Sequence, residues 1–583
     1  MHMKKKEAQN TDTRSGAQCV VDGLEHAGCE VVFGYPGGTV LDIFNVLCLS
    51  PVHFILSRHE QGAVHMADGY ARATGKPGVC LVTSGPGATN TVTGLATAHM
   101  DGIPMVCISG QVALSAIGND AFQEADIIGI TRAVTKHNTL VRSADEIPAA
   151  IAEAFYIATS GKPGPVLIDI PKDVQRQLTA ARPPASVSLR SYNPGAVIAP
   201  EALAALAEAI NRSERPVLYV GGGAISANAS GPLTALARKA NIPVTTTLMG
   251  LGAFPEDDPL ALRMLGMHGA AVANLAVSAC DLLISLGARF DDRVTGKIAE
   301  FAPRAKIAHI DIDPSAIGKS VRVDFPICGD AREAAEGLLP LVRPAAHAAW
   351  LAELDAIKQR YPLKYNHSDT VLQPMFVLEE IDRLRKGQGI IVTDVGQHQM
   401  WATQFIRHVQ PRSFISSGGL GTMGFGLPAA IGAQLARPGE LVVAICGDGG
   451  IQMNAQELVV AVEHNIPVKT IILNNGHLGM VRQWQQMFYG KRYSAVVLGS
   501  SNRPVNERIR HDAAPVYRPD FVKLAEAHGM RAARVTWPAE VAPTLERAFA
   551  DPHPWVIECI VDPDANVFPM VPPGAAVSAM IVN

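Results

Sequence analysis

Two short motifs in the last third of the chain, Gly447-Asp448-Gly449 and Asn474-Asn475, most constrain how it can fold. They are separated by 24 residues, and the apolar runs 441–446 and 468–473 predict a buried strand directly before each motif. The residues between have helical spacing, so the segment predicts a strand, a crossover helix and a second, parallel strand. Both motifs then lie at the carboxyl edge of one sheet, where open α/β sheets bind their ligands.

The residue types in these motifs favour a metal ion bound to a diphosphate. The carboxylate of Asp448, the amide oxygen of Asn475 and nearby backbone carbonyls are hard donors that suit Mg²⁺, which keeps other positions for water and phosphate oxygens. The glycines Gly447, Gly449 and Gly450 let the backbone approach a diphosphate closely. Either motif alone would be read as a turn after a strand, because Gly, Asp and Asn form turns. Their combination at this spacing favours the metal site.

Composition narrows the functional classes. The chain has 583 residues, of which 48% are apolar and 18% charged, so several domains with large cores are expected. The net charge is −4 without a basic patch, which argues against a nucleic-acid partner. The most apolar long window, 270–288, contains Asp281 and is too mixed to span a membrane. The nine cysteines are scattered and residues 1–10 lack the apolar core of a secretory signal, so we expect a cytoplasmic protein.

Strand-like and helix-like runs alternate in three segments, a pattern typical of α/β folds with doubly wound parallel sheets. We expect the following organisation: a disordered N-terminus (1–14), three domains (15–185, 195–345 and 370–570) and a C-terminal tail (571–583). The proline-rich stretch 180–200 reads as a linker. Strands of the first and third domains both end in glycine-rich loops, which suggests that these two domains are related.

Motifs along nearly the whole chain, from about residue 15 to 570, resemble those of a known enzyme family. In the first domain they are Gly34-Tyr35-Pro36-Gly37-Gly38, Arg58-His59-Glu60-Gln61-Gly62-Ala63, 69–75 and Thr83-Ser84-Gly85-Pro86-Gly87-Ala88-Thr89-Asn90, and in the third 394–401, 418–430 and 474–486. Together with the two motifs described first, they resemble the thiamine-diphosphate (ThDP) carboligases. Within that group the resemblance is closest to the catalytic subunits of acetohydroxyacid synthases, also called acetolactate synthases.

The resemblance implies a pyrimidine-binding first domain, a central FAD-binding domain and a third domain that binds diphosphate and Mg²⁺. It implies ThDP, Mg²⁺ and FAD as cofactors and small-molecule 2-keto acids as substrates. The implied reaction decarboxylates pyruvate and ligates the hydroxyethyl unit to pyruvate or 2-ketobutyrate, the first common step of branched-chain amino-acid synthesis. Because each coenzyme would lie between the first domain of one chain and the third domain of another, a homodimer is the smallest implied unit. A homotetramer and a small regulatory subunit are compatible with it.

Glu60 is the first catalytic candidate. The apolar run 52–56 predicts a strand, and a helix with alanines at i+4 spacing follows, so Glu60 starts a closely packed helix. Chemistry alone favours an acid that interacts with the helix dipole or with Arg58. The resemblance instead implies that the protonated Glu60 carboxyl binds the aminopyrimidine of ThDP. It would favour the imino tautomer that removes the C2 proton, which is general acid–base catalysis.

The resemblance assigns further residues to the coenzyme, metal and substrates. The other catalytic positions are Gln123, Lys172, Gly421, whose carbonyl would accept from the coenzyme's 4′-amino group, and Met423, which would hold the coenzyme bent. The ThDP contacts are Pro36, Gly38, Thr39, Pro86, Asn90, Gly396, Gln397, His398, Gly447, Asp448, Gly449, Gly450 and Met480. The Mg²⁺ ligands are Asp448, Asn475 and the backbone of His477. Substrate contacts are Met480, Val481 and Trp484, a helical stripe that more often belongs to a core.

The central domain carries a weak dinucleotide signal, because Gly221-Gly222-Gly223 after the strand-like run 216–220 is an incomplete fingerprint. By itself the loop 287–293 would be a solvated ion-pair loop. The resemblance assigns these residues to FAD, with arginines meeting phosphate by forked hydrogen bonds. The full set is Lys162, Gly221, Gly222, Gly223, Thr247, Leu248, Met267, His268, Gly287, Arg289, Asp291, Arg293, Asp311, Ile312 and Asp330. The flavin would be structural, because the reaction has no net redox change.

Three departures from the family pattern stand out. Lys162 stands where the family usually has arginine, Thr39 replaces the usual alanine after Gly37-Gly38, and the stretch 494–519 is longer than typical. Rival interpretations are a pyruvate oxidase-like enzyme that uses flavin for redox chemistry, a carboligase with another acceptor, and a non-catalytic assembly relative. The last would be expected to have lost Glu60, Asp448 or Asn475, and all three are present.

Overall fold

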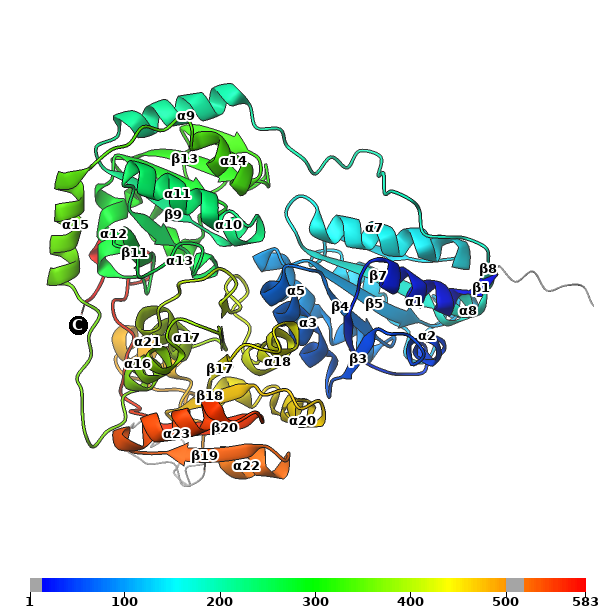
Figure 1. Cartoon of the computed structure of the whole chain (residues 1–583). Coiled ribbons are helices and arrows are strands. Elements are labelled where there is room, and N and C mark those ends of the chain that lie inside the picture. The colour runs from blue at the N-terminus through cyan, green and yellow to red at the C-terminus, as the bar shows by residue number, and fades with distance from the viewer. Residues whose placement is uncertain (1–12, 500–517, 583) are drawn as a thin grey trace, which may run out of the picture. The chain divides into compact units, whose positions relative to one another are not determined.

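The computed structural model describes residues 13–499 and 518–582, which form three six-stranded sheets, each with all strands parallel (Figure 1). Two compact units are present: Met1–Ala71 with Lys76–Tyr192, and Arg72–Gly75 with Asn193–Asn583. The first sheet belongs to the first unit, and the central and third sheets belong to the second. The prediction of three parallel α/β domains is confirmed. The predicted disordered N-terminus and the extended segment 494–519 lie largely outside the described residues.

The first sheet has the strand order β3-β2-β4-β5-β7-β6. Its strands are β2 (Val31–Tyr35), β3 (His53–Leu56), β4 (Gly78–Val82), β5 (Met105–Gln111), β6 (His137–Leu140) and β7 (Pro165–Pro171). Helices α1 (Gly16–His26), α2 (Leu41–Leu47) and α7 (Ile147–Thr159) bury one face in a single core. Helices α3 (Glu60–Thr74) and α5 (Val92–Asp101) lie on the other face, and α4 (Pro86–Thr89), α6 (Ile127–Thr131) and α8 (Lys172–Arg176) are short connections (Figure 1). A two-stranded ribbon joins β1 (Arg14–Ser15) to β8 (Leu178–Thr179).

Small residues bring α3 close to its neighbours, as its alanine spacing predicted. A Cβ placed on Gly78 of β4 would lie 2.1 Å from the carbonyl oxygen of Ala67 in α3. A Cβ on Gly94 of α5 would lie 2.3 Å from a methyl group of Val64 in α3. Because neither position has room for a side chain, α3 is fixed on the sheet, and Glu60 is its first residue.

The third sheet has the strand order β16-β15-β17-β18-β20-β19. Its strands are β15 (Ile390–Thr393), β16 (Phe414–Ile415), β17 (Val442–Gly447), β18 (Lys469–Asn474), β19 (Arg531–Val535) and β20 (Trp555–Ile560). Its helices are α16 (Pro374–Arg385), α17 (Gln397–Phe405), α18 (Gly426–Ala436), α19 (Asp448–Ile451), α20 (Leu458–Glu463), α21 (Gly479–Phe488), α22 (Phe521–Ala527) and α23 (Pro538–Ala550). Strands β17 and β18 are parallel, as the two motifs predicted, and they pair directly.

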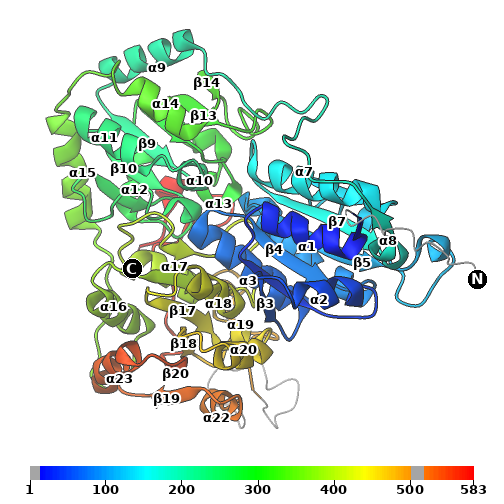
Figure 2. The same ribbon diagram turned by 45° about the vertical axis from the view of Figure 1, so that its right-hand side comes forward.

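The central sheet has the strand order β11-β10-β9-β12-β13-β14. Its strands are β9 (Pro216–Val220), β10 (Val244–Thr246), β11 (Ala261–Met264), β12 (Leu282–Leu286), β13 (Lys306–Asp311) and β14 (Phe325–Cys328). Helices α9 (Pro200–Arg212), α11 (Ser230–Ala240) and α14 (Ala331–Leu338) cover one face, and α12 (Ala271–Ala279) and α15 (Ala348–Arg360) the other (Figure 2). Two short helices, α10 (Gly222–Ser226) and α13 (Asp292–Thr295), follow β9 and β12. Numbered along this domain, the strand order is 3-2-1-4-5-6, which is that of dinucleotide-binding folds.

The apolar window 270–288 divides into helix α12 and strand β12. Among the described residues, no helix combines the length and apolar character needed to cross a bilayer. All nine cysteines carry free thiols.

The C-terminal segment returns to the central domain, where the backbone N–H of Val571 donates to the carbonyl oxygen of Met267 at 2.8 Å (Figure 1).

Candidate active site

Glu60 and Asn90 meet at the carboxyl edge of the first sheet. Glu60 follows β3, Asn90 follows the glycine-rich turn after β4, and both are half-buried. The Nδ2 atom of Asn90 donates to Oε2 of Glu60 at 3.0 Å. The other carboxylate oxygen faces Gly87, where a Cβ would lie 3.4 Å away. Glu60 therefore has one oxygen oriented by an amide and the other turned toward the glycine-rich turn.

Thr39 joins two loops of this edge. Its hydroxyl lies 2.9 Å from the hydroxyl of Thr83 and accepts from the backbone N–H of Ser84 at 3.0 Å. Its carbonyl oxygen accepts from the side chain of Gln175 at 2.8 Å. The residue that departs from the family pattern therefore ties the loop after β2, with Pro36 and Gly38, to the loop after β4, with Pro86 and Asn90.

Gln123 and Lys172 lie at the same edge, after β5 and β7. Gln123 has a φ of 61°, and a Cβ on Gly85 would lie 2.8 Å from the Gln123 carbonyl oxygen, so the two loops are in contact. Lys162 precedes β7 and lies at the opposite edge of the sheet. The sheet thus brings Glu60, Asn90 and Gln123 toward one another and separates them from Lys162.

Asp448 and Asn475 meet at the carboxyl edge of the third sheet, after β17 and β18. Asp448 is 4% exposed, and its carboxylate accepts from the backbone N–H of Gly476. Burial raises the pKa of Asp448 to about 7, although backbone hydrogen bonds act in the opposite direction. The backbone N–H of His477 donates to Oδ1 of Asn475 at 2.9 Å. A buried carboxylate beside an amide oxygen is a donor set that fits Mg²⁺.

Asp394 organises the neighbouring loop, although its sequence context gave it no role. Its carboxylate accepts from the backbone N–H groups of Val395 at 2.8 Å, Gly424 at 2.9 Å and Gly426 at 3.0 Å. A Cβ on Gly450 would lie 2.3 Å from Asp394 Oδ1, so the loop after β17 packs against the same carboxylate. Asp394 follows the apolar strand β15, and that position was the signal by which it could have been found.

The remaining diphosphate candidates surround this edge. Gly396, Gln397 and His398 follow β15, Gly421 and Met423 follow β16, and Gly447, Gly449 and Gly450 end or follow β17. Burial lowers the pKa of His398 to about 4, so its ring is neutral, and its Nε2 is buried without a hydrogen-bond partner among the described residues. A Cβ on Gly447 would lie 3.0 Å from that ring. The ring donates to the backbone carbonyl of Asp394, so Nε2 of the neutral ring is an acceptor and would need a donor. The closely packed glycines of this edge are what fits a bound diphosphate.

The substrate candidates Met480, Val481 and Trp484 lie in the first turns of α21. Met480 packs against the core of the third domain, whereas Val481 is 49% exposed. Trp484 contacts Phe488 edge to face and has the guanidinium of Arg293 5.9 Å from its ring centre. Of these three residues, Met480 therefore belongs to the core, whereas Val481 does not. Trp484 faces Arg293 of the central domain.

The FAD candidates of the second unit lie at the carboxyl edge of the central sheet. The backbone N–H of Gly223 donates to the carbonyl oxygen of Gly287 at 2.9 Å, and a Cβ on Gly221 would lie 2.3 Å from that oxygen. The loops after β9 and β12 therefore touch through their glycines. The candidates after the other strands are Thr247 and Leu248 (β10), Met267 and His268 (β11), Ile312 (β13) and Asp330 (β14), with Asp311 ending β13.

Several of these side chains already have local hydrogen bonds. Asp330 accepts from the first backbone N–H groups of α14, and Thr247 accepts from the backbone N–H of Gly250. Asp291 accepts from the backbone N–H of Arg293, and Arg289 lies 3.4 Å from Asp291. Arg289 is exposed, so this ion pair is weak and its guanidinium can exchange partners. The strand order and the glycine contact fit a dinucleotide, while these polar residues also have structural roles.

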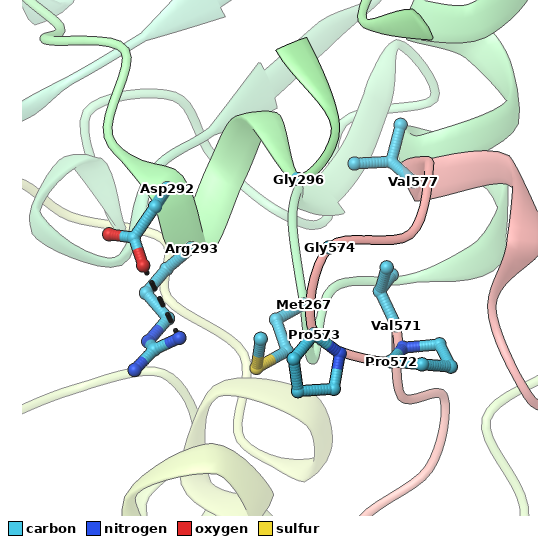
Figure 3. Close-up of a pocket in the computed structure, with 9 residues that line it drawn as sticks. All are labelled: Met267, Asp292, Arg293, Gly296, Val571, Pro572, Pro573, Gly574 and Val577. Carbon is cyan, nitrogen blue, oxygen red and sulfur yellow. Dashed lines mark ion pairs between the residues drawn. The ribbon is translucent and has the colours of Figure 1, made fainter.

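A cavity of about 210 Å³ lies where the C-terminal segment meets the central domain (Figure 3). It is lined by Met267, Asp292, Arg293, Gly296, Val571, Pro572, Pro573, Gly574 and Val577. Arg293 is ion-paired with Asp292 at 3.3 Å (Figure 3). Its guanidinium also lies 5.9 Å from the ring centre of Trp484. The sequence assigned Met267 and Arg293 to the flavin and gave no role to the segment 571–577.

Comparison with known proteins agrees with this geometry. Residues 14–130, 203–338 and 394–559 match the N-terminal thiamine-pyrophosphate binding, central and C-terminal thiamine-pyrophosphate binding domains of thiamine pyrophosphate enzymes. The chain is 48% identical to a probable acetolactate synthase large subunit of Methanocaldococcus jannaschii, over 97% of this chain and 95% of that protein.

Two further relatives have similar identity and coverage. A chloroplastic acetolactate synthase of Zea mays is 47% identical over 98% of this chain and 89% of its own length. An acetolactate synthase of Mycobacterium bovis is 49% identical over 96% of this chain and 90% of its own length. The rival interpretations of the sequence gain no support from these matches. The chain belongs to the acetolactate synthase family of thiamine-pyrophosphate enzymes.

Proposed function

We propose that this protein is an acetolactate synthase that decarboxylates pyruvate and ligates the hydroxyethyl unit to a second 2-keto acid. The observation that carries the proposal is the meeting of Asp448 and Asn475 at adjacent ends of β17 and β18. Family membership supplies the reaction class, and this edge supplies a donor set for a metal–diphosphate group. Bound ThDP would supply the nucleophilic carbon and the electron sink for decarboxylation.

The residues of the first sheet would handle the proton. Glu60 would hold a proton on its carboxyl against the coenzyme's aminopyrimidine, while Asn90 fixes the orientation of that carboxyl through Oε2. Gln123 and Lys172, at the same edge, would line the path of the substrate. A positioned acid of this kind contributes roughly 10²–10⁴-fold to a rate.

The residues of the third sheet would hold the charged end of the coenzyme. Asp448, the side chain of Asn475 and the backbone carbonyl of His477 would bind Mg²⁺. The glycines after β17 would face the diphosphate, with the ring of His398 packed beside Gly447. Met423 and Gly421, in the loop fixed by Asp394, would support the bend of the coenzyme.

The central domain would bind FAD in a structural role. Its dinucleotide strand order and the contact between Gly221-Gly222-Gly223 and Gly287 support this proposal. Arg289 would meet a phosphate by forked hydrogen bonds.

Arg293 lies beside Trp484, so it is suited to the carboxylate that every 2-keto acid carries. Trp484 would then discriminate between acceptors by about 1–3 kcal/mol for one methylene.

We propose a homodimer as the smallest active assembly. A homotetramer, a small regulatory subunit and a cytoplasmic location remain predictions from the sequence.

The direct test incubates the purified full-length protein with pyruvate, ThDP, Mg²⁺ and FAD, with and without 2-ketobutyrate, under anaerobic conditions. Acetolactate should form without oxygen, and a mixed product should appear when 2-ketobutyrate is present. A Glu60→Gln variant is the control for a mechanism that needs the carboxyl. Product formation that required oxygen would instead indicate flavin redox chemistry, and equal activity of the variant would contradict the role of Glu60.

A further inference from the structure

A glutamine on α21 holds the C-terminal segment by both atoms of its amide. The Nε2 atom of Gln483 donates to the carbonyl oxygen of Val567 at 3.0 Å, and the backbone N–H of Val567 donates to Gln483 Oε1 at 2.8 Å. Gln483 and Val567 are fully buried. Because a peptide group presents one donor and one acceptor here, the Gln483 amide can satisfy both in only one orientation.

The orientation of the Gln483 amide in turn fixes the orientation of a second buried glutamine, Gln397. Gln397 is 3% exposed, and its Nε2 donates to Gln483 Oε1 at 2.9 Å and to the carbonyl oxygen of Ala565 at 3.0 Å. Both partners are oxygens, so the nitrogen of Gln397 must point toward them. Its Oε1 therefore points the other way, toward the start of α21. There a Cβ on Gly479 would lie 2.1 Å from this oxygen, so Gly479 leaves the room that Gln397 needs.

The chain of amides ends at Asn475. The Nδ2 atom of Asn475 donates to Gln397 Oε1 at 3.4 Å, which is a long hydrogen bond, and Asn475 Oδ1 accepts from the backbone N–H of His477 at 2.9 Å. An amide oxygen has two acceptor positions, so accepting from His477 leaves Oδ1 able to bind a cation. The nitrogen and oxygen of an asparagine amide are nearly equal in size, so burial alone does not choose between them. The hydrogen bonds make that choice.

We infer that Gln397 and Gln483 are positioning residues that present Oδ1 of Asn475, rather than its NH₂ group, to the bound metal ion. This inference rests on the proposed function, in which Asn475 is a ligand of Mg²⁺. Hydrogen-bond partners of metal ligands fix the ligand's orientation, and their loss typically weakens metal binding by about 10–100-fold. The C-terminal segment contributes to the metal site through the peptide group of Val567.

A purely structural role predicts a different outcome. Buried glutamines that only close a fold lower stability when they are replaced, without changing a distant ligand site. Gln434 is a matched example, because it is 2% exposed and its Nε2 donates to the carbonyl oxygens of Arg437 at 3.0 Å and Glu440 at 2.9 Å. It lies in α18 and takes no part in the amide chain.

The experiment measures the Mg²⁺ concentration at which ThDP binding by the full-length apoprotein is half-maximal, by titration calorimetry. Urea unfolding of the apoprotein is measured beside it. The variants are Gln397→Met, Gln483→Met, the double variant, Gln483→Glu and the control Gln434→Met. Methionine keeps the length of the side chain and removes the amide. A protonated glutamate at position 483 keeps an acceptor oxygen for Gln397 and an O–H for the Val567 carbonyl, so it preserves the direction of the chain.

We expect Gln397→Met to raise the Mg²⁺ midpoint by about 10–100-fold and Gln483→Met to raise it by less. The double variant should raise the Mg²⁺ midpoint no more than Gln397→Met alone does, because both changes break the same chain of hydrogen bonds. Gln483→Glu should stay close to wild type, and Gln434→Met should lose stability without moving the midpoint. If Gln483→Met does not fold, Gln397→Met and Gln483→Glu still provide the comparison.

Two results would overturn the inference in distinguishable ways. Midpoints for Gln397→Met and Gln483→Met equal to wild type, with stability losses like that of Gln434→Met, would reduce both residues to structural roles and leave the proposed function standing. A wild-type protein that bound ThDP without any dependence on Mg²⁺ would overturn the metal site itself, and the inference with it.

Discussion

The first and third sheets have the same topology and different chemistry. Numbered along its own domain, each has the strand order 2-1-3-4-6-5 with all strands parallel. In the first sheet the loops at the carboxyl edge gather an acid, Glu60, and a neutral donor, Asn90. In the third they gather a buried carboxylate, Asp448, the amide of Asn475 and closely packed glycines. The strand order places loops at the edge, and a few residues in those loops decide whether the edge suits proton chemistry or an anion with its metal.

The sixth strand of each domain sharpens this contrast, because both carry a buried acid. Asp169 of β7 accepts from the neutral side chains of Ser109 at 2.7 Å and Gln111 at 2.9 Å, and burial raises its pKa to about 7. Glu558 of β20 accepts from the guanidinium of Arg534 at 2.7 Å and from Asn474 at 2.7 Å. The third sheet pairs its acid with a cation, whereas the first surrounds it with neutral donors.

The largest effect is expected at Glu60. Glu60→Gln keeps the size of the side chain and removes the carboxyl group, so acetolactate formation should fall by about 10²–10⁴-fold. Binding of ThDP, which the third sheet is proposed to dominate, should change little. Steady-state product formation and calorimetric coenzyme binding measure the two quantities. A Glu60→Gln variant that lost coenzyme binding as completely as activity would show that proton transfer and coenzyme binding are not separated between the first and third sheets.

The mirror experiment is Asp448→Asn. The variant loses the carboxylate of the proposed metal set, so the Mg²⁺ needed for half-maximal ThDP binding should rise by roughly 100-fold, the upper end of effects seen for disturbed metal sites. Saturating Mg²⁺ should restore a large part of the rate, which it cannot do for Glu60→Gln. Failure of added Mg²⁺ to recover any activity would argue against this assignment of Asp448.

The parts of the fold and site that could be predicted from the sequence are those that depend on contacts between residues close together in the chain. The strand-like run 216–220 coincides with β9, because an apolar run of that length before a glycine-rich loop has few other interpretations. The parallel direction of β17 and β18 followed from one short crossover, and their direct pairing is seen in the structure. Local periodicity and connection length were sufficient for these elements.

Contacts between residues far apart in the sequence could not be predicted. Gln483 and Gln397 are separated by 86 positions, and Gln483 and Val567 by 84, so no spacing rule joins them. Asp394 stood in a recognised motif, but its role depends on the N–H groups of Gly424 and Gly426, about 30 residues later. Met267 and Arg293 were assigned to the flavin, and only the fold shows that the segment 571–577 encloses a cavity with them.

Asp169 provides a pH test of the contrast between the two buried acids. Its folded pKa of about 7 lies above the value of about 3.9 for an unfolded chain, so the folded state holds a proton that the unfolded state releases between these values. Stability should therefore fall as the pH rises from about 4 to about 7, by at most about 1.4 kcal/mol per unit.

Asp169→Asn cannot titrate, so its urea midpoint, measured relative to wild type, should improve between about pH 4 and pH 7. Ser109→Ala serves as a control, because it removes one hydrogen bond and leaves the titration in place. An unchanged difference between variant and wild type across that range would mean that Asp169 is ionised in the folded protein at acidic pH.

The smallest effect is expected where the two domains hold their edge loops together. The third domain uses the carboxylate of Asp394, which accepts from three backbone N–H groups, and the first uses the single hydroxyl of Thr39, which contacts Thr83 and accepts from the Ser84 N–H. Thr39→Val keeps the shape of the side chain and leaves that N–H unpaired, which should cost about 1 kcal/mol of unfolding free energy. Thr39→Ser keeps the hydroxyl and should preserve the bond. Because a carboxylate makes stronger hydrogen bonds than a hydroxyl does, Asp394→Asn should cost more. Equal losses in urea unfolding for Thr39→Val and Asp394→Asn would show that the neutral and the charged devices hold their loops equally well.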